Sequence, residues 1–467
     1  MTQPTPHERP SSPASPPHAH GHSHSLASAG ADVRTSPLLR YSTAALLVVV
    51  AVSTVLGLVW LWPDYSKVGE AAELASYQAV DAGYEQGEVL SVSECEAPAT
   101  GDPGGSGAPG SEGLEEIHEV AGAQTACRVL SVGVRSGPDA GQLVELTVRG
   151  SLAGSGLSEG DRVELAAFPR EAHPESEGTT AAQGYRLAND YEVGGIVRHL
   201  PLAILVLLFA GVVVAVGRLR GLFALVALGV AAFVLLGFVL PALIAGGPAL
   251  LIGLVGSSAI MLVTLFFVHG PNLRTTSALI GTLAGILIIS GVSWISVRVT
   301  RLSGLGDESS GMLSGMVAEI DFRGLLTCSI LIAGLGVLND VTITQASSVW
   351  ELRAAAPEMT RREIYRRAMR IGRDHIASTV YTVFFAYAGA AISTLIVLYL
   401  YNRPVLSLLT QEDIAIEIVR TMAGSIGLVL SVPITTAVAA MFVPPAAAEV
   451  LSPWREGLPT AGADPRP

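Results

Sequence analysis

Long runs of apolar residues dominate the chain, and short charged segments separate them. A helical residue rises about 1.5 Å and the hydrocarbon core of a bilayer is about 30 Å thick, so a spanning helix needs about 20 apolar residues. An otherwise apolar stretch, 324–350, carries Asp340 as its only charge, and the uncharged stretches of similar length are 42–62, 200–217, 221–245, 249–268, 275–297, 376–402 and 421–443. This pattern predicts a mainly α, polytopic membrane helix bundle with about eight transmembrane helices.

Arginines between these stretches indicate the orientation of the chain. Arg34 and Arg40 precede the first stretch, and more arginines lie within 218–220, 269–274 and 351–374. Since basic loops stay on the cytoplasmic side of a membrane, we expect these segments and both termini to be cytoplasmic. Arginine is used almost to the exclusion of lysine, which is typical of a GC-rich bacterial genome, so the predicted location is the bacterial cytoplasmic membrane.

The segment 63–199 between the first two stretches differs in composition from the rest. It holds 23 acidic residues against 8 basic ones, and acidic segments cross to the outer face readily. Alternating or apolar runs rich in Val and Leu, bounded by glycine turns, predict strands at 87–92, 126–134, 142–148 and 161–167. We therefore expect a small extracytoplasmic β domain, with a flexible glycine-rich loop at 99–113.

Cys95 and Cys127 both lie in this exported segment. Disulfides form in oxidising compartments, so the two thiols could close a loop across the glycine-rich insertion. The alternative is a pair of reduced, partly buried thiols. The third cysteine, Cys328, lies in a predicted span and is expected to be a packing residue.

The stretch 324–350 carries the most unusual polar residues. Placing an aspartate at the centre of a spanning helix costs about 2.5–3.5 kcal/mol, so Asp340 needs a partner or a task. Helical spacing places Thr344 and Ser347 on the same face as Asp340, and the neighbouring polar residues are Asn339, Thr342 and Gln345. We expect this polar stripe to face other helices rather than lipid.

The next span begins with hydroxyl residues at helical spacing, Ser378, Thr379 and Thr382, which could face the stripe. Two interpretations of Asp340 follow. In the functional one, a protonatable carboxyl group loads and releases a proton or a cation, with its pKa raised by desolvation. In the structural one, the carboxyl group is hydrogen-bonded to hydroxyls and holds two helices together.

A basic amphipathic helix is predicted between these two spans. Ile364, Ala368 and Ile371 mark its apolar face, arginines occupy the other face, and Thr360 with Glu363 fits a capping box. Such a helix would lie along the inner membrane surface.

The N-terminal tail is rich in Pro, Ser and Ala and is expected to be disordered. It contains alternate histidines that could chelate a transition metal: His18, His20, His22 and His24. The alternative is a low-complexity tail without a metal role. The predicted layout is a tail at 1–40, an anchor at 41–62, the β domain at 63–199, spans two to five at 200–297, an outer loop at 298–323, the polar span at 324–350, the basic helix at 351–375, the last two spans at 376–443 and a disordered tail at 444–467.

Composition narrows the function classes. Apolar residues make up 50% of the chain, charged ones 15%, and the net charge is -12. The low share of charged residues argues against a soluble enzyme, and the negative charge argues against a nucleic-acid partner. No sequence motif of a metalloprotease, serine hydrolase or phosphate-binding loop occurs, so we expect neither an enzyme nor a cofactor.

These features together resemble the YibE/F-like integral membrane protein family over roughly residues 40–445. The resemblance rests on short motifs, namely Gly217-Arg218-Leu219-Arg220-Gly221-Leu222, 264–274 with His269-Gly270, Asp321-Phe322-Arg323-Gly324, the run from Gly336 through Asp340-Val341-Thr342 to Trp350-Glu351-Leu352, and Arg370-Ile371-Gly372-Arg373-Asp374-His375-Ile376. The family usually has a second acid where this chain has Asn339, which argues against a two-carboxylate mechanism. The resemblance implies a transport role.

A more distant likeness is to the RND and SecD/SecF transporters. This chain and those transporters have the same order of segments: one span, a large outer domain, a later span with an aspartate, a basic helix and a threonine-rich span. This likeness implies that Asp340 corresponds to a proton-relay acid.

Two functions follow as hypotheses. The first is a proton-coupled transporter or energy-coupling membrane component, with the bilayer and an unknown small molecule or ion as partners. The second is a non-transporting scaffold whose acidic outer domain binds an envelope protein.

Overall fold

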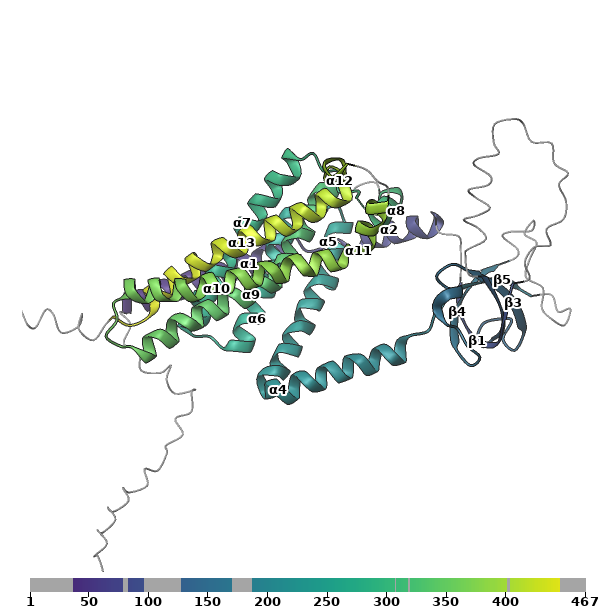
Figure 1. Cartoon of the computed structure of the whole chain (residues 1–467), viewed down its shortest axis with the longest axis horizontal. Coiled ribbons are helices and arrows are strands. Elements are labelled where there is room, and N and C mark those ends of the chain that lie inside the picture. The colour runs from purple at the N-terminus through teal and green to yellow at the C-terminus, as the bar shows by residue number, and fades with distance from the viewer. Residues whose placement is uncertain are drawn as a thin grey trace, which may run out of the picture.

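The computed structural model describes residues 37–78, 83–95, 127–169, 187–306, 308–317, 320–400 and 404–445. Helices form an elongated bundle, and a small β domain lies at one end of it (Figure 1). The longer helices are α1 (Pro37–Trp60), α2 (Tyr65–Gln78), α4 (His199–Val234), α6 (Ala249–His269), α7 (Leu273–Val299), α9 (Phe322–Ala355), α10 (Arg361–Ala390) and α13 (Glu412–Phe442). The shorter ones are η1 (Ala153–Ser155), η3 (Leu235–Val239), α5 (Leu240–Ile244), α8 (Glu308–Met316), α11 (Ile392–Leu400) and α12 (Val405–Leu409).

Helices α7, α9 and α13 form the centre of the bundle, because each packs extensively against the other two. Glycines allow the close approach. A Cβ atom added at Gly281 of α7 would lie 1.8 Å from the hydroxyl oxygen of Thr435 in α13, and one at Gly427 would lie 2.2 Å from Ile289. Small residues let helix backbones approach in this way in membranes, so the three helices form a tightly packed unit.

Within the residues that the structure describes, six helical stretches are long and apolar enough to cross a membrane, against the eight that the sequence predicts. They are Tyr41–Trp60, His199–Ile244, Ala249–His269, Leu273–Val299, Phe322–Ala355 and Glu412–Phe442. The difference arises in two places, the merging of the second and third predicted spans and the division of the seventh.

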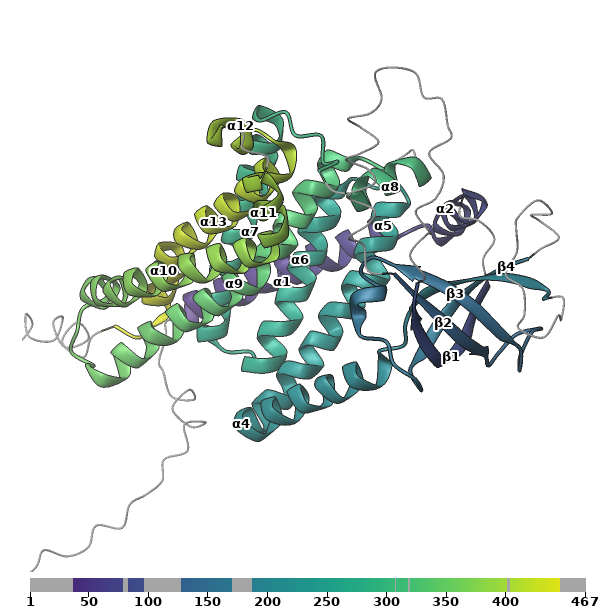
Figure 2. The same ribbon diagram turned by 45° about the vertical axis from the view of Figure 1, so that its right-hand side comes forward.

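The second and third predicted spans form one stretch, His199–Ile244, whose 46 residues would measure about 69 Å if straight. The stretch is bent instead. Arg218 has φ 53° and ψ -135° inside α4, and the two legs of α4 diverge from this point (Figures 1 and 2). Gly221 follows the bend, and a Cβ there would lie 2.3 Å from the carbonyl oxygen of Val213. The bend therefore separates two legs that are each near the length of one span.

The seventh predicted span, 376–402, is divided between two helices. The chain from Arg361 to Ala390 is one helix, α10, and the break before α11 comes at Ala391. The basic segment is therefore not a separate helix lying on the membrane surface, as the sequence suggested, but the first half of α10. Its apolar face also differs from the prediction, because Ile364 and Ala368 are buried whereas Ile371 is exposed.

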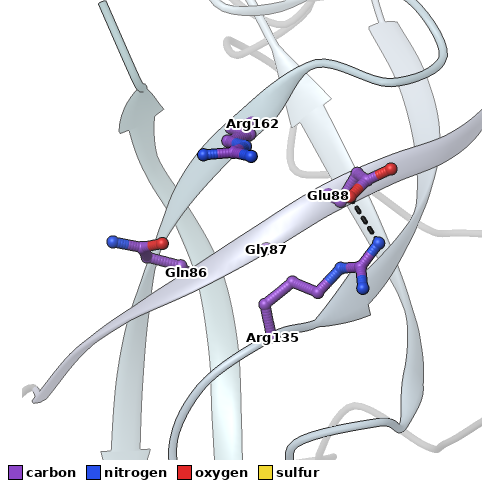
Figure 3. Close-up of a pocket in the computed structure, with 5 residues that line it drawn as sticks. All are labelled: Gln86, Gly87, Glu88, Arg135 and Arg162. Atoms are coloured by element: carbon purple, nitrogen blue, oxygen red, sulfur yellow. Dashed lines mark hydrogen bonds and ion pairs between the residues drawn. The ribbon is translucent and has the colours of Figure 1, made fainter. Parts of the chain in front are cut away.

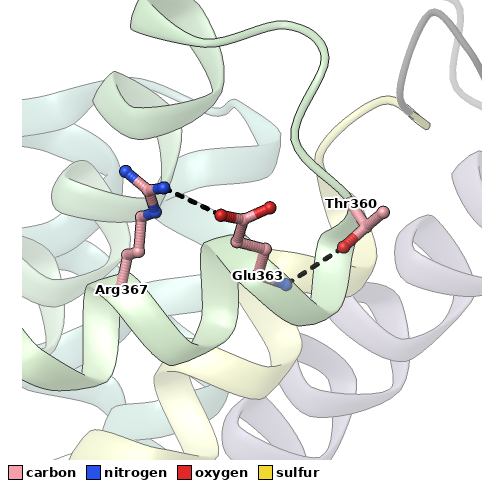
Figure 4. Close-up of polar contacts among 3 residues, drawn as sticks. All are labelled: Thr360, Glu363 and Arg367. Carbon is pink, nitrogen blue, oxygen red and sulfur yellow. Dashed lines mark hydrogen bonds and ion pairs between the residues drawn. The ribbon is translucent and has the colours of Figure 1, made fainter.

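The predicted cap at the start of α10 is confirmed in part. Thr360 Oγ1 accepts a hydrogen bond from the backbone N–H of Glu363 at 3.2 Å. The Glu363 carboxylate does not complete a capping box and instead accepts from Arg367 at 2.8 Å (Figure 4).

The β domain is a five-stranded antiparallel half-barrel in the order β3-β2-β1-β4-β5. The predicted strands correspond to β1 (Gly83–Glu94), β2 (Cys127–Val134), β3 (Leu143–Arg149) and β4 (Arg162–Pro169). Strand β5 (Asn189–Ile196) is not predicted from the sequence, because its two glycines and polar residues give a weak strand pattern. Buried aliphatic side chains from β1 to β4, such as Val89 and Leu165, form a core separate from that of the bundle.

Two tertiary links close this domain. Cys95 and Cys127 form a disulfide with their Cα atoms 5.6 Å apart. The hydroxyl of Tyr191 in β5 lies 2.9 Å from Asp139 Oδ2 and 3.0 Å from Glu85 Oε2. Burial, together with these two carboxylates, raises the pKa of Tyr191, so the hydroxyl stays protonated and ties β5 to the rest of the sheet.

The close packing of α7 on α13 leads to a first prediction. Gly281→Val would force the two helices apart, and overpacking of this kind costs about 1–3 kcal/mol. We expect a lower midpoint of thermal unfolding in detergent and a lower yield of folded protein. Gly291→Val on the same helix is the control, since an added Cβ there meets nothing within 4 Å. Equal loss in both variants would contradict the close-packing argument.

Candidate functional site

Asp340 lies deep within α9. At about 1.5 Å per residue, it is about 26 Å along the helix from Arg323 and about 20 Å from Arg353. The helix is continuous between them, from its cap at Asp321, which accepts from the Gly324 N–H at 3.1 Å, to Ala355. The carboxyl group is therefore far from both charged ends of the helix.

The polar residues around Asp340 lie on two opposite sides of α9. Thr342 and Gln345 are buried, whereas Asp340 and Thr344 are exposed. Helical positions two residues apart differ by about 200° around the axis, and positions four residues apart differ by about 40°. Thr342 therefore lies on the side opposite Asp340, and Thr344 lies on the same side as Asp340. The expectation that the whole stripe faces other helices is therefore wrong for Asp340 and Thr344.

The buried side links four helices by hydrogen bonds. The hydroxyl oxygens of Thr342 in α9 and Thr282 in α7 lie 2.7 Å apart. Gln345 Nε2 donates to the carbonyl oxygen of Ala368 in α10 at 3.0 Å and to Thr436 Oγ1 in α13 at 2.8 Å. Each buried polar group satisfied in this way avoids a desolvation penalty of about 1–3 kcal/mol, so these contacts fix α9 against its neighbours.

The exposed side of α9, which we call the open face, has an unusual composition. Among the residues that the structure describes, no large apolar side chain of α9 is exposed. The exposed surface of α4 is the opposite, because it carries large apolar side chains such as Leu207 and Phe209. The open face consists instead of small or polar residues, Ala333, Gly336, Asp340, Thr344 and Glu351, with half-buried Ser347 at its edge. Such a face is poorly suited to lipid.

Helix α10 is also polar at the level of Asp340. The contact of Gln345 with Gly372 and the antiparallel course of the two helices place Asp340 level with about Ile376. Asp374, Ser378 and Thr382 of α10 are exposed near this level, and Thr379 is buried. Both helices therefore expose polar positions near the level of Asp340.

The predicted hydroxyls do not bind Asp340. Those of Ser378 and Thr379 donate to the carbonyl oxygen of His375, and that of Thr382 donates to Ser378. Ser347 and Thr342 likewise donate to carbonyl oxygens of their own helix. Within the described chain, Asp340 has no hydrogen-bond or ion-pair partner, so the structure does not support its role as an interhelical tie.

Two further polar atoms near this level have unmet hydrogen-bonding capacity. Asn339 Oδ1 and His375 Nε2 are buried and have no hydrogen-bond partner among the described residues. In the sequence, His375 belongs to a motif of the family resemblance but was not predicted to be a site residue, although its position where the basic half of α10 becomes apolar was a usable signal. Both atoms could bind a water molecule or a proton-carrying group.

The predicted metal-binding histidines cannot be placed in the structure. His18, His20, His22 and His24 lie outside the described residues, and the described part of the chain contains no cluster of three or more His, Cys, Asp or Glu side chains that could hold a metal. A shallow polar hollow on the β domain, which the sequence did not indicate, is lined by Gln86, Gly87, Glu88, Arg135 and Arg162, with a 2.5 Å ion pair between Glu88 and Arg135 (Figure 3).

Comparison with known proteins gives one match. The model of the YibE/F-like protein family matches residues 205–445, which include the bend at Arg218, the central helices and the open face. No curated protein and no solved structure matches the chain. The family match covers more than half of the sequence, and the chain therefore belongs to the YibE/F-like protein family.

Proposed function

We propose that this chain is a proton-coupled transporter, or an energy-coupling component, of the bacterial cytoplasmic membrane, with Asp340 as the group that takes up and releases the proton. The observation that carries the proposal is the open face of α9, where a carboxyl group without a protein partner lies midway along a helix among small and polar residues. A group in this position is accessible to a proton and free to change its charge.

The charge of Asp340 would bias the position of α9. A carboxylate costs about 2.5–3.5 kcal/mol at the centre of a spanning helix and less toward its end, whereas the protonated form avoids much of this cost. Because about 1.4 kcal/mol corresponds to a tenfold change in an equilibrium, the difference is enough to shift a two-state equilibrium by up to about two orders of magnitude. The charged form favours an aqueous open face, and the neutral form favours a covered one.

A shift of α9 would reach other helices through the buried side. Gln345 binds both α10 and α13, and Thr342 contacts α7. These hydrogen bonds either move with α9 or must break, so protonation on one side of the helix has consequences on the other. The substrate or the driven process would be coupled to this movement.

We also propose eight spans with cytoplasmic termini, with each leg of the bent stretch His199–Ile244 and the outer part of α10 with α11 completing the count. Figure 1 supports this arrangement, because the described chain begins and ends at the end of the bundle that carries the α9–α10 connection, opposite the β domain. The arginine-rich start of α10 lies at that same end, which fits a cytoplasmic location.

The alternative is a scaffold whose outer domain binds an envelope partner. It is favoured by the separate core of the half-barrel and by the polar hollow between Arg135 and Arg162. In that case the bundle only anchors the domain, and the charge state of Asp340 is irrelevant.

The proposal is tested by Asp340→Asn, which keeps the shape of the side chain but cannot ionise. We expect at least a tenfold loss in rescue of a deletion strain's phenotype, at unchanged protein abundance in the membrane. Glu351→Gln is the matched control on the same face near the helix end, and it should retain function. Full rescue by Asp340→Asn, combined with loss of rescue on removal of residues 83–196, would replace the proposal with the scaffold.

The open face can be probed separately by cysteine labelling in a Cys328→Ala background. A water-soluble maleimide needs water beside the thiol, since the thiolate is the reactive form. We expect Thr344→Cys to react at least tenfold faster than Thr342→Cys, which is buried, and than Leu207→Cys, which is 71% exposed but on an apolar surface. Reaction of Thr344→Cys as slow as that of Leu207→Cys would show that lipid covers the open face.

A further inference from the structure

Four arginines in the first half of α10 form a continuous exposed stripe. Arg362, Arg366, Arg370 and Arg373 are all exposed, and at 100° per residue they fall within an arc of about 80°. Neighbouring arginines are already engaged, because Arg361 donates to the carbonyl oxygen of Val443 and Arg367 to Glu363. In the described part of the chain, the four stripe residues have no acidic partner. We call them the arginine stripe.

The continuity of α10 fixes the depth of the stripe. The same helix continues into exposed Tyr381, Phe384 and Phe385, which require an apolar environment. Arg361, just before the stripe, donates to the carbonyl oxygen of Val443, the residue that follows the apolar helix α13. From Arg373 to Phe384 the helix rises about 16 Å, about half the thickness of the hydrocarbon core. The stripe is therefore held where the helix leaves the apolar layer.

We propose that the arginine stripe binds the phosphate groups of anionic phospholipids in the leaflet at this end of the bundle. Guanidinium groups form paired hydrogen bonds with phosphate oxygens, and anionic headgroups attract basic residues that lie at the membrane surface. The stripe extends over about 16 Å, which suits several headgroups in a row rather than one soluble phosphate. Its continuity with a lipid-exposed surface favours lipid over an acidic cytosolic protein.

The test compares two triple variants of the full chain with the same change of charge. Arg366→Gln, Arg370→Gln and Arg373→Gln remove most of the stripe, whereas Arg298→Gln, Arg301→Gln and Arg323→Gln remove exposed arginines at the other end of the bundle. Each protein is placed in nanodiscs of phosphatidylcholine alone or with 30% phosphatidylglycerol. We expect phosphatidylglycerol to raise the unfolding midpoint of the unmodified chain by several degrees, the stripe variant to lose at least half of this shift, and the control variant to keep it.

Three outcomes would overturn the proposal. They are an unchanged shift in the stripe variant, an equal loss in both variants, and the same stabilisation by millimolar inorganic phosphate in phosphatidylcholine discs, which would indicate a soluble-anion site. The unfolding midpoint in phosphatidylcholine alone shows whether the stripe variant is folded. If it is not, the double variant with Arg370→Gln and Arg373→Gln replaces it. We expect this double variant to lose a smaller but measurable part of the shift. The proposal does not depend on proton coupling at Asp340.

Discussion

The fold depends on the close contact of α7, α9 and α13, in which buried hydroxyl and amide groups of different helices are hydrogen-bonded to one another. Glycines bring the helices together at Gly281 and Gly427, and hydroxyl or amide groups satisfy one another across the contact at Thr342 and Gln345. In an apolar medium the hydrophobic effect does little to hold helices together, so packing and hydrogen bonds supply the cohesion. The rest of the bundle is arranged around this unit.

The open face differs from this packed contact, because its central polar group has no hydrogen-bond partner. Thr342 and Gln345 on the inner side of α9 are satisfied within the protein, so structure alone accounts for them. Asp340 on the opposite side has no such partner in the described chain, and its surroundings are neither lipid-like nor a packed core. A costly group that contributes nothing visible to cohesion is more economically explained by function. Its exposure also changes the form of the hypothesis, from a carboxyl group enclosed between two helices to one on a surface that water, lipid or a second protein element can cover in turn.

Much of this could be predicted from the sequence, because hydropathy and helical spacing act locally. The long apolar helices, four strands, the Thr360 cap and the shared side of Asp340 and Thr344 all follow from nearest neighbours along the chain. What failed depended on longer-range packing. Contacts between segments distant in sequence decide three features. They decide whether the charged segment around Arg218 forms a loop or a bend, whether α10 continues past Arg373, and whether β5 pairs with β4. Whether the side of α9 with Asp340 is buried or exposed also depends on such contacts. Helical spacing shows which residues share a side of the helix, but it does not show which side faces the other helices.

The continuity of α10 physically connects the arginine stripe to α9, the helix that carries the open face. Its first half carries the arginine stripe, while Ala368 accepts the hydrogen bond from Gln345 and Gly372 lies against the same side chain. A helix without a break transmits a tilt along its whole length, so a headgroup contact at Arg370 and the packing of α9 beside Gln345 are not independent. The lipid composition of one leaflet would then act on the position of α9, and through it on how readily Asp340 is covered. This link would run through one continuous helix, α10, and through the buried amide of Gln345, which binds both α10 and α13.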